Sequence, residues 1–175
     1  AERKNGAYWE WTNYGTQVLE DGTYRLQVED GTYRILVSPG WRAANVVETP
    51  SGEFTVAGDQ KTVNLTLLAP NLTGTISNLA AAVDSSKLDG QEARSYPAAY
   101  AYVLQKIDSN YVWINKYLTI YADGSYSTYL PDGTYQIYVY QINQLVSGLS
   151  RANSSDIVVA GSTNTSTFEL RSANL

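Results

Sequence analysis

The sequence predicts an all-β protein built from two tandem seven-stranded β-sandwich repeats of Greek-key type, the first lacking its opening strands. The main observation is a repeated stretch: Asp21–Val37, DGTYRLQVEDGTYRILV, occurs again as Asp123–Val139, DGSYSTYLPDGTYQIYV. Within it, apolar and polar residues alternate, which is typical of strands with one buried face. An Asp-Gly pair in the middle of each copy is a strong short-range signal for a β-hairpin. We therefore expect two hairpins, turning at Asp30-Gly31 and at Asp132-Gly133.

The repeat extends beyond this stretch. An offset of 102 positions aligns Trp9–Val37 with Tyr111–Val139, and eleven of the 29 pairs are identical. An offset of 103 then aligns Phe54–Leu67 with Ile157–Leu170. These alignments predict a partial repeat at residues 1–70 and a complete one at residues 71–175. Asn174-Leu175 matches Asn71-Leu72, as the opening of a third copy would.

The second repeat contains about seven strand-like segments, the number expected of a β-sandwich. Residues 73–77 open it, and residues 78–97 form a polar insertion in which residues 80–83 suit one helical turn. Residues 99–106 alternate small or β-branched side chains with aromatic ones, as a strand does. Residues 111–121, the hairpin and a closing pair of strands around Ala160-Gly161 complete the repeat.

The hairpins also predict which side chains face the core. In the second repeat the predicted inward residues are Tyr126, Tyr135, Ile137 and Val139, matched in the first by Tyr24, Tyr33, Ile35 and Val37. Because tight hairpin turns require positive φ, we expect it at Gly31 and Gly133.

The composition argues against several classes of function. The net charge of −5 disfavours nucleic acid as a partner, and no apolar run approaches the ~20 residues of a membrane-spanning helix. Cys, His and Met are absent, which removes thiol chemistry, the commonest general base and the usual zinc ligands. The abundance of Tyr, Ser, Thr and Asn is typical of exported β-structure, so we expect an extracellular or cell-surface location.

Paired carboxylates are the main catalytic groups that remain. Glu20-Asp21 and Glu29-Asp30 fall in predicted turns, where Asp commonly bonds to the backbone. Calcium on the turn aspartates is an alternative, although the D-x-D-x-D-G spacing of a calcium loop is missing. We expect no enzyme activity, no metal site and no cofactor.

Three groups of residues in the second repeat carry a family resemblance: Gly74 with Ile76, Ala101 with Val103, and the DGSY…LPDGTY segment at 123–135. Together they resemble the carboxypeptidase-regulatory-like domain, a family with the transthyretin-like (prealbumin-like) seven-stranded sandwich. The resemblance covers the second repeat and the later two-thirds of the first, but the 78–97 insertion is longer than the family's usual loop. It implies tandem, non-catalytic modules of secreted and surface proteins.

Two sets of residues are candidate sites for sugars. The first is four N-x-S/T sequons, which predict glycosylation at Asn64, Asn71, Asn153 and Asn164. The second is a set of aromatic residues that could contact a polysaccharide: Trp9, Trp41, Tyr138 and Tyr140. The alternative for the aromatic residues is cross-strand packing, which we expect for the recurring pair Trp11 and Trp113. We also expect Tyr138 and Tyr140 to flank Tyr129.

The function expected from these observations is structural: a repeat of an extracellular fibre, stalk or adhesin whose partners are neighbouring copies of the same repeat. Because the first repeat lacks its opening strands, a neighbour's strand could fill it; an incomplete fragment is the alternative. The competing function is a carbohydrate-binding accessory module.

Overall fold

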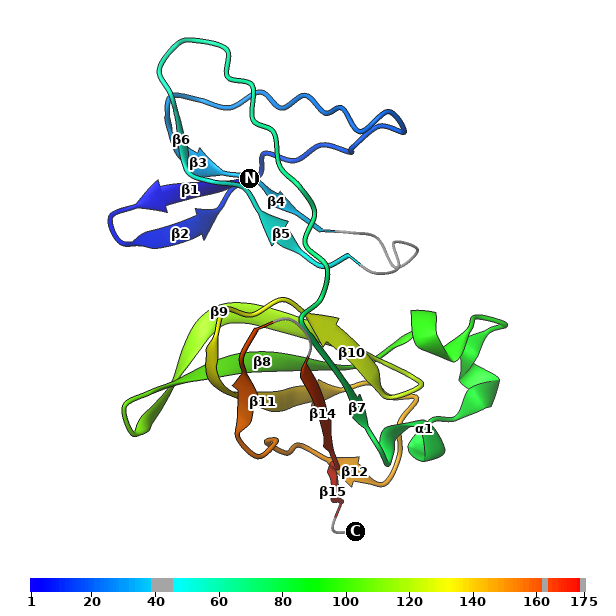
Figure 1. The fold of residues 1–175 in the computed structure, drawn as a ribbon. Coiled ribbons are helices and arrows are strands. Elements are labelled where there is room, and N and C mark those ends of the chain that lie inside the picture. The colour runs from blue at the N-terminus through cyan, green and yellow to red at the C-terminus, as the bar shows by residue number, and fades with distance from the viewer. Residues whose placement is uncertain (39–45, 162–163, 174–175) are drawn as a thin grey trace. The chain divides into compact units, whose positions relative to one another are not determined.

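The computed structural model describes residues 1–38, 46–161 and 164–173. Across these residues the protein is all-β, and its short helical turns lie within residues 79–95. The chain divides into two compact units, one within residues 1–68 and the other containing residues 69–175. Figure 1 traces the strands of both units.

The second unit is sandwich-like, with two sheets that enclose one core. In the four-stranded sheet, of order β13-β11-β8-β9, neighbouring strands are antiparallel. In the three-stranded sheet, β7 lies between β10, which is antiparallel to it, and β14, which is parallel. Figure 1 shows the three-stranded sheet lying across the four-stranded one. The strands are β7 Leu72–Ile76, β8 Pro97–Ile107, β9 Asn110–Tyr121, β10 Ser125–Thr128, β11 Gly133–Ile142, β13 Ile157–Val159 and β14 Asn164–Phe168, with a small pair, β12 Leu149–Ser150 and β15 Arg171–Ser172.

Strand alternation builds this core, because successive side chains of a strand point to opposite faces. Ala99, Ala101 and Val103 of β8 are fully buried, and Leu72 and Ile76 of β7 lie in the same cluster. The four predicted core residues of this unit are confirmed, each at most 2% exposed: Tyr126, Tyr135, Ile137 and Val139.

The 78–97 insertion is an ordered part of the second unit. It contains the single turn α1 Leu79–Ala82 and the 3₁₀ turns η1 Ser85–Leu88 and η2 Ala93–Ser95. Leu79 is fully buried, and Leu88 and Tyr96 pack against the core. The Asp84 side chain accepts a hydrogen bond from the Ser86 backbone N–H at 3.2 Å, which starts η1 and limits α1 to one turn.

The first unit has a four-stranded sheet of order β2-β1-β3-β6, in which neighbouring strands are antiparallel. Its pairing register repeats that of β9-β8-β11-β13. Glu2 lies opposite Trp11 and Arg34, as Leu104 lies opposite Trp113 and Gln136. The strands are β1 Glu2–Asn5, β2 Tyr8–Trp11, β3 Gly31–Arg34 and β6 Phe54–Val56, with a short pair, β4 Leu36–Val37 and β5 Thr49–Pro50.

The core prediction holds only in part for the first unit. Tyr33 is fully buried, but Tyr24, Ile35 and Val37 are only half-buried. The reason is that the described part of this unit contains no counterpart of the β10-β7-β14 sheet, so a face that is covered in the second unit stays partly open.

The hairpin prediction is wrong for both copies. The strand β10 pairs with β7, whereas β11 pairs with β13 and β8, so the chain crosses from one sheet to the other between Thr128 and Gly133. The aspartates bond across to a later loop: Asp30 Oδ1 accepts from the Gly58 N–H at 2.7 Å, and Asp132 Oδ1 from the Gly161 N–H at 3.0 Å.

The glycine angles agree with this correction. The φ of Gly31 is positive, as predicted, but at 159° it is close to extended backbone, and Gly133 has no positive φ. The left-handed φ of a tight turn occurs one turn earlier, at Gly22 (81°) and Gly124 (84°), so the Asp-Gly pairs that make tight turns are Asp21-Gly22 and Asp123-Gly124. The closing strands around Ala160-Gly161 also join different sheets, β13 with β11 and β14 with β7.

Candidate functional site

Aromatic side chains gather on the outer face of the four-stranded sheet of the second unit. We call this cluster the tyrosine face; it consists of Tyr102, Trp113, Tyr117, Tyr138 and Tyr140. Tyr102 of β8 lies opposite Tyr117 of β9 on one side and Tyr138 of β11 on the other. Because Ala101 and Val103 point into the core, strand alternation turns Tyr102 outward.

Tyr102 is the centre of the cluster. Its ring stacks on Tyr140 with centroids 4.1 Å apart and planes 10° apart, and it contacts Tyr117 and Trp113 at 5.3 and 5.6 Å. A β-bulge between Val139 and Gln141 contains Tyr140. Bulges re-aim side chains, which explains how Tyr138 and Tyr140 both reach the same ring.

The cluster is packed at its centre and open at its β9 side. Trp113 and Tyr117 are 48% and 50% exposed, whereas Tyr102, Tyr138 and Tyr140 are half-buried. Burial, followed by the neighbouring hydroxyls of Tyr102 and Tyr117, raises the pKa of Tyr140. The face offers flat apolar rings with hydroxyl rims, suited to stacking and to hydrogen bonding.

Two of the four predicted sugar-contact residues, Tyr138 and Tyr140, lie in this cluster. Trp9 is in the first unit, half-buried, with the Arg34 guanidinium 4.7 Å from its ring centroid. Trp41 lies outside the described residues. The expectation that Tyr129 lies between Tyr138 and Tyr140 is wrong, because Tyr129 follows β10 in the opposite sheet.

Sequence reasoning missed Tyr102, Trp113 and Tyr117. The alternation of residues 99–106 places Tyr102 on an outer face, but the residues that meet it there depend on the register of three strands. The expected cross-strand packing of the recurring tryptophans is confirmed for Trp113, whose ring centroid lies 5.6 Å from that of Tyr102 and 5.7 Å from that of Tyr117. Trp11 is 63% exposed and Trp113 48%, because both lie on the outer side of their sheets.

A polar group borders the tyrosine face. Asp156 accepts hydrogen bonds from Tyr111 Oη, from Lys106 Nζ at 2.9 Å and from Gln136 Nε2 at 3.0 Å. The Tyr111 bond, followed by that from Lys106, lowers the pKa of Asp156 to about 2. A carboxylate held ionised in this way is a poor general acid or base at neutral pH.

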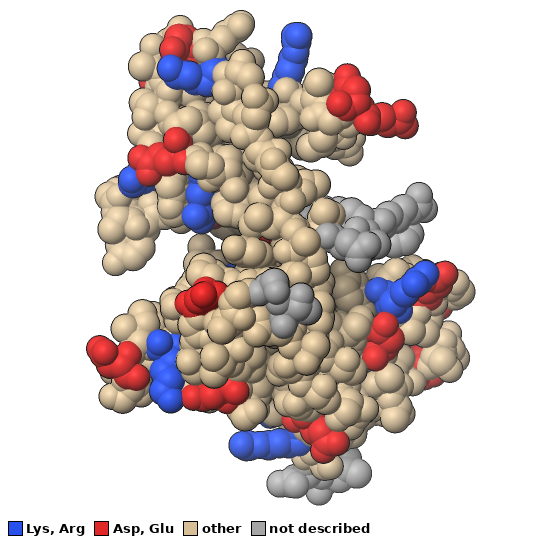
Figure 2. Space-filling model, in the orientation of Figure 1, with Lys and Arg blue, Asp and Glu red and all other residues tan. Residues whose placement is uncertain are grey.

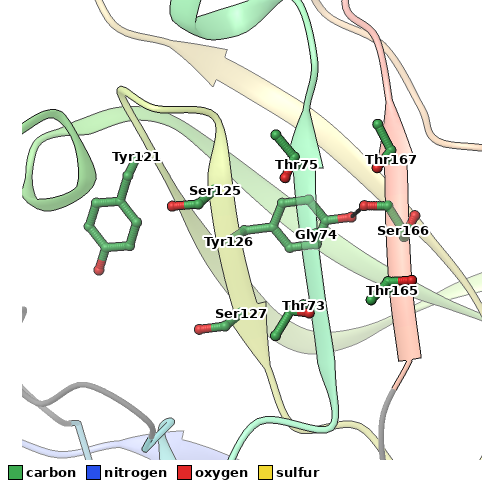
Figure 3. A pocket seen from close by; sticks show the side chains of 10 residues that line it. All are labelled: Thr73, Gly74, Thr75, Tyr121, Ser125, Tyr126, Ser127, Thr165, Ser166 and Thr167. Atoms are coloured by element: carbon green, nitrogen blue, oxygen red, sulfur yellow. Dashed lines mark hydrogen bonds between the residues drawn. The ribbon is translucent and has the colours of Figure 1, made fainter.

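The outer face of the three-stranded sheet carries hydroxyl groups. They line an open depression that crosses all three strands and has a volume of about 460 Å³. Figure 3 shows the side chains that line it. The outward residues are Thr73 and Thr75 of β7, Ser125 and Ser127 of β10, and Thr165 and Thr167 of β14. In Figure 2 the surface over β7 and β14 shows no charged side chain. These hydroxyls can form hydrogen bonds, and that of Ser125 already donates to the turn carboxylate of Asp123 at 2.5 Å.

The predicted glycosylation sites differ in accessibility. Asn64 and Asn153 are exposed. Asn71 is 7% exposed, and its side chain bonds to both the N–H and the carbonyl of Leu130, at 2.9 and 2.7 Å. Asn164 is half-buried and donates from Nδ2 to the Asn71 carbonyl at 3.1 Å. A glycan on Asn71 would displace these backbone bonds, so the folded unit leaves no room for one there.

The turn carboxylates serve the backbone, as expected. Asp21 Oδ1 accepts from the Thr23 N–H at 2.9 Å, and Asp123 Oδ1 from the Ser125 N–H at 2.8 Å. Within the described ranges no group of three or more metal-ligating side chains gathers. The helices found in those ranges are too short to cross a membrane.

In comparisons with known proteins, no family model, no curated protein and no solved structure matches this chain. The resemblance to the carboxypeptidase-regulatory-like domain therefore stays a prediction that rests on the motifs in the sequence.

Proposed function

We propose that this chain is a non-catalytic structural segment of an extracellular fibre, stalk or adhesin, built from tandem Greek-key sandwiches that bear tension. The observation that carries the proposal is the parallel pairing of β7 with β14, the first and last strands of the second unit's main sandwich. Five residue pairs, Leu72–Asn164 to Ile76–Phe168, hold them together. Tension applied at the start of β7 and the end of β14 pulls parallel strands in opposite directions, so these hydrogen bonds are loaded together in shear.

Equivalent contacts in the two units support tandem repetition. Ser51 Oγ accepts from the Ile35 N–H at 2.9 Å, as Ser154 Oγ accepts from the Ile137 N–H at 3.0 Å. Two further pairs of contacts match in the same way. They are the bonds of Asp30 and Asp132 to the Gly58 and Gly161 N–H groups, and the ion pairs Lys4–Glu53 and Lys106–Asp156. All follow the offsets of 102 and 103 seen in the sequence, as expected of copies that fold by one plan.

Composition supports the extracellular setting. A chain without Cys or Met is resistant to the commonest side-chain oxidations, and this chain also lacks His. The DG-x-Y…LPDGTY motif, with its resemblance to tandem modules of secreted proteins, points the same way.

Single-molecule pulling tests the proposal. Because the chain contains no Cys, the pair Pro70→Cys and Glu169→Cys places unique handles just outside β7 and β14. We expect one unfolding step that releases roughly 350 Å, the extended length of residues 72–168. Handles at Pro70→Cys and Tyr129→Cys are the control, since they peel β7 from antiparallel β10 bond by bond and should need a lower force. Gradual extension without a step in the first geometry would refute a load-bearing role.

The tyrosine face favours a second function, a carbohydrate-binding accessory module. Its exposed rings at Trp113 and Tyr117 are the kind of surface on which the apolar faces of sugars stack. Polysaccharide pull-down tests it: binding that is lost in Trp113→Ala and kept in Tyr129→Ala, a 38% exposed residue outside the face, would favour this function. Binding that both variants keep would exclude the face.

A further inference from the structure

Two segments of the first unit correspond to β10 and β14 but belong to no strand. They are residues 23–28 and 61–67, and the offsets of 102 and 103 match them to Ser125–Leu130 and Asn164–Leu170. Exposure alternates along residues 23–28, where Tyr24, Leu26 and Val28 are half-buried and their neighbours are exposed. The same alternation occurs at Val63 and Leu65. Each segment thus shows the alternating burial of a strand with one inward apolar face.

A tyrosine sets the distance between the two segments in both units. Tyr126 Oη donates to the Ser166 carbonyl at 3.3 Å after its ring passes across β7 at Gly74, as Figure 3 shows. In the first unit the equivalent Tyr24 Oη donates to the Val63 carbonyl at 2.6 Å. Two strands that flank a third lie about 10 Å apart, and the tyrosine spans that gap. Residues 23–28 and 61–67 are therefore separated by the width of one strand, and we call this gap the slot.

Among the described residues, no strand pairs with either edge of the slot. No backbone group of residues 24–28 forms a hydrogen bond there, and the Val63 carbonyl meets only the Tyr24 hydroxyl. Inward side chains lack cover: Leu67 is 42% exposed where its counterpart Leu170 is 3%. Unpaired strand edges beside an apolar face are a template for another strand.

We propose that the slot accepts the opening strand of another copy of the repeat, with the pattern Leu-Thr-Gly-Thr-Ile that β7 has here. This inference rests on the proposed function, since it supplies the contact by which structural repeats would join. The donor lies antiparallel to residues 23–26 and parallel to residues 61–65, with its glycine between Tyr24 and Val63. Its Leu and Ile then face inward beside Leu26 and Leu65, as Leu72 and Ile76 do in the second unit.

The glycine is the specificity determinant. A Cβ built on Gly74 would lie 2.2 Å from the Tyr126 ring and hydroxyl and 2.4 Å from the Ser166 carbonyl oxygen. No side chain fits at that distance, so a donor strand must present glycine wherever the tyrosine crosses it. The hydroxyl residues on either side of the glycine face outward and carry no such restriction.

Peptide binding to the full chain tests the slot. A fluorescent peptide with the sequence of residues 70–77 should bind saturably, and the same peptide carrying Gly74→Val should bind at least about tenfold more weakly. Hydrogen exchange should slow at residues 23–28 and 61–67 when the first peptide is present and stay unchanged in β8 and β11. The variant Leu26→Asp, which places a charge in the slot, should abolish binding.

Two results would overturn the inference: no binding of the glycine peptide, or equal binding of the two peptides. Protection that appears in the second unit instead would overturn it as well. The pulling experiment is independent, because it loads only the second unit. If the second unit resists force but the glycine peptide does not bind, the slot is refuted and the proposed function stands. If the peptide binds but the second unit extends gradually under force, only the load-bearing role is refuted.

Discussion

At the scale of single residues, Gly74 shows how one missing side chain shapes the sandwich. The Tyr126 ring crosses β7 at this position and is 2% exposed, so it has little freedom to move aside. Burial in the same position raises the pKa of Tyr126. The glycine of the Gly-x-Ile motif is therefore required by close packing, since Gly74 has no positive φ.

The variant Gly74→Ala should destabilise the second unit by about 1–3 kcal/mol or more, the usual cost of overpacking a core. Urea denaturation measures the loss. Thr73→Ala, on the outward face of the same strand, is the matched control and should change stability by no more than about 0.5 kcal/mol. Equal losses would mean that Tyr126 yields to the new methyl group.

A second residue-level prediction concerns Asp156. Its pKa of about 2 lies below the ordinary 3.8, so the ionised carboxylate stabilises the folded state above pH 4 and that contribution disappears as the pH falls toward 2. In Tyr111→Phe the largest cause of the shift is removed, and the titration midpoint should move up toward 3.8. NMR titration of the Asp156 carboxyl carbon measures the midpoint in the original chain and in the variant. Tyr117→Phe, which leaves the bonds to Asp156 intact, should not move the midpoint.

At the scale of elements, β11 contributes side chains both to the core of the second unit and to the tyrosine face. Its inward side chains Tyr135, Ile137 and Val139 build the core, while Tyr138 and Tyr140 belong to the tyrosine face. The strand lies between β13 and β8 and is paired on both sides. Changes on its two faces should therefore separate stability from binding.

Ile137→Ala should cost about 2–5 kcal/mol, because it removes buried methylene and methyl groups from a packed core. Ile35→Ala, the equivalent change in the first unit, should cost less, since Ile35 is only half-buried. Chemical denaturation of the two variants compares them. A loss for Ile137→Ala no larger than that for Ile35→Ala would contradict the burial of β11.

At the scale of the whole molecule, each unit has its own four-stranded sheet with the same register, but the two sheets differ in whether a second sheet covers them. The four-stranded sheets match residue for residue in register, whereas the three-stranded sheet is described only for the second unit. Val18 is 50% exposed where its counterpart Ile120 is fully buried. The first unit therefore buries less apolar surface and should be the less stable of the two.

Hydrogen exchange of the isolated chain should show this difference. Amides at residues 24–28 and 63–67 should exchange much faster than those at 126–130 and 166–170, because the former lack ladder partners. Comparable protection of the two sets in a monomeric sample would mean that the first unit is already complete. Tyr24 and Tyr126 make the same hydrogen bond, from the hydroxyl to a backbone carbonyl of the facing segment. A difference in exchange between the two sets therefore reflects the missing backbone partners and not this side-chain bond.

The sequence by itself determined the all-β class, the offset between the two copies and the inward face of the second unit's strands. Periodicity and repetition are local signals, and a two-residue period states which side chains share a face. The absence of Cys and His was equally plain from the composition, and with it the absence of thiol and imidazole side chains.

Only the tertiary structure decided which strands are partners. Alternation is the same for a strand that turns back on its neighbour and for one that crosses to a facing sheet, which is why the two Asp-Gly hairpins were predicted wrongly. The pairing of β7 with β14 joins residues as far apart as Leu72 and Asn164, and the tyrosine face needs β8, β9 and β11 in one register. Such long-range choices depend on burial summed over the whole unit, a quantity that no short stretch of sequence contains.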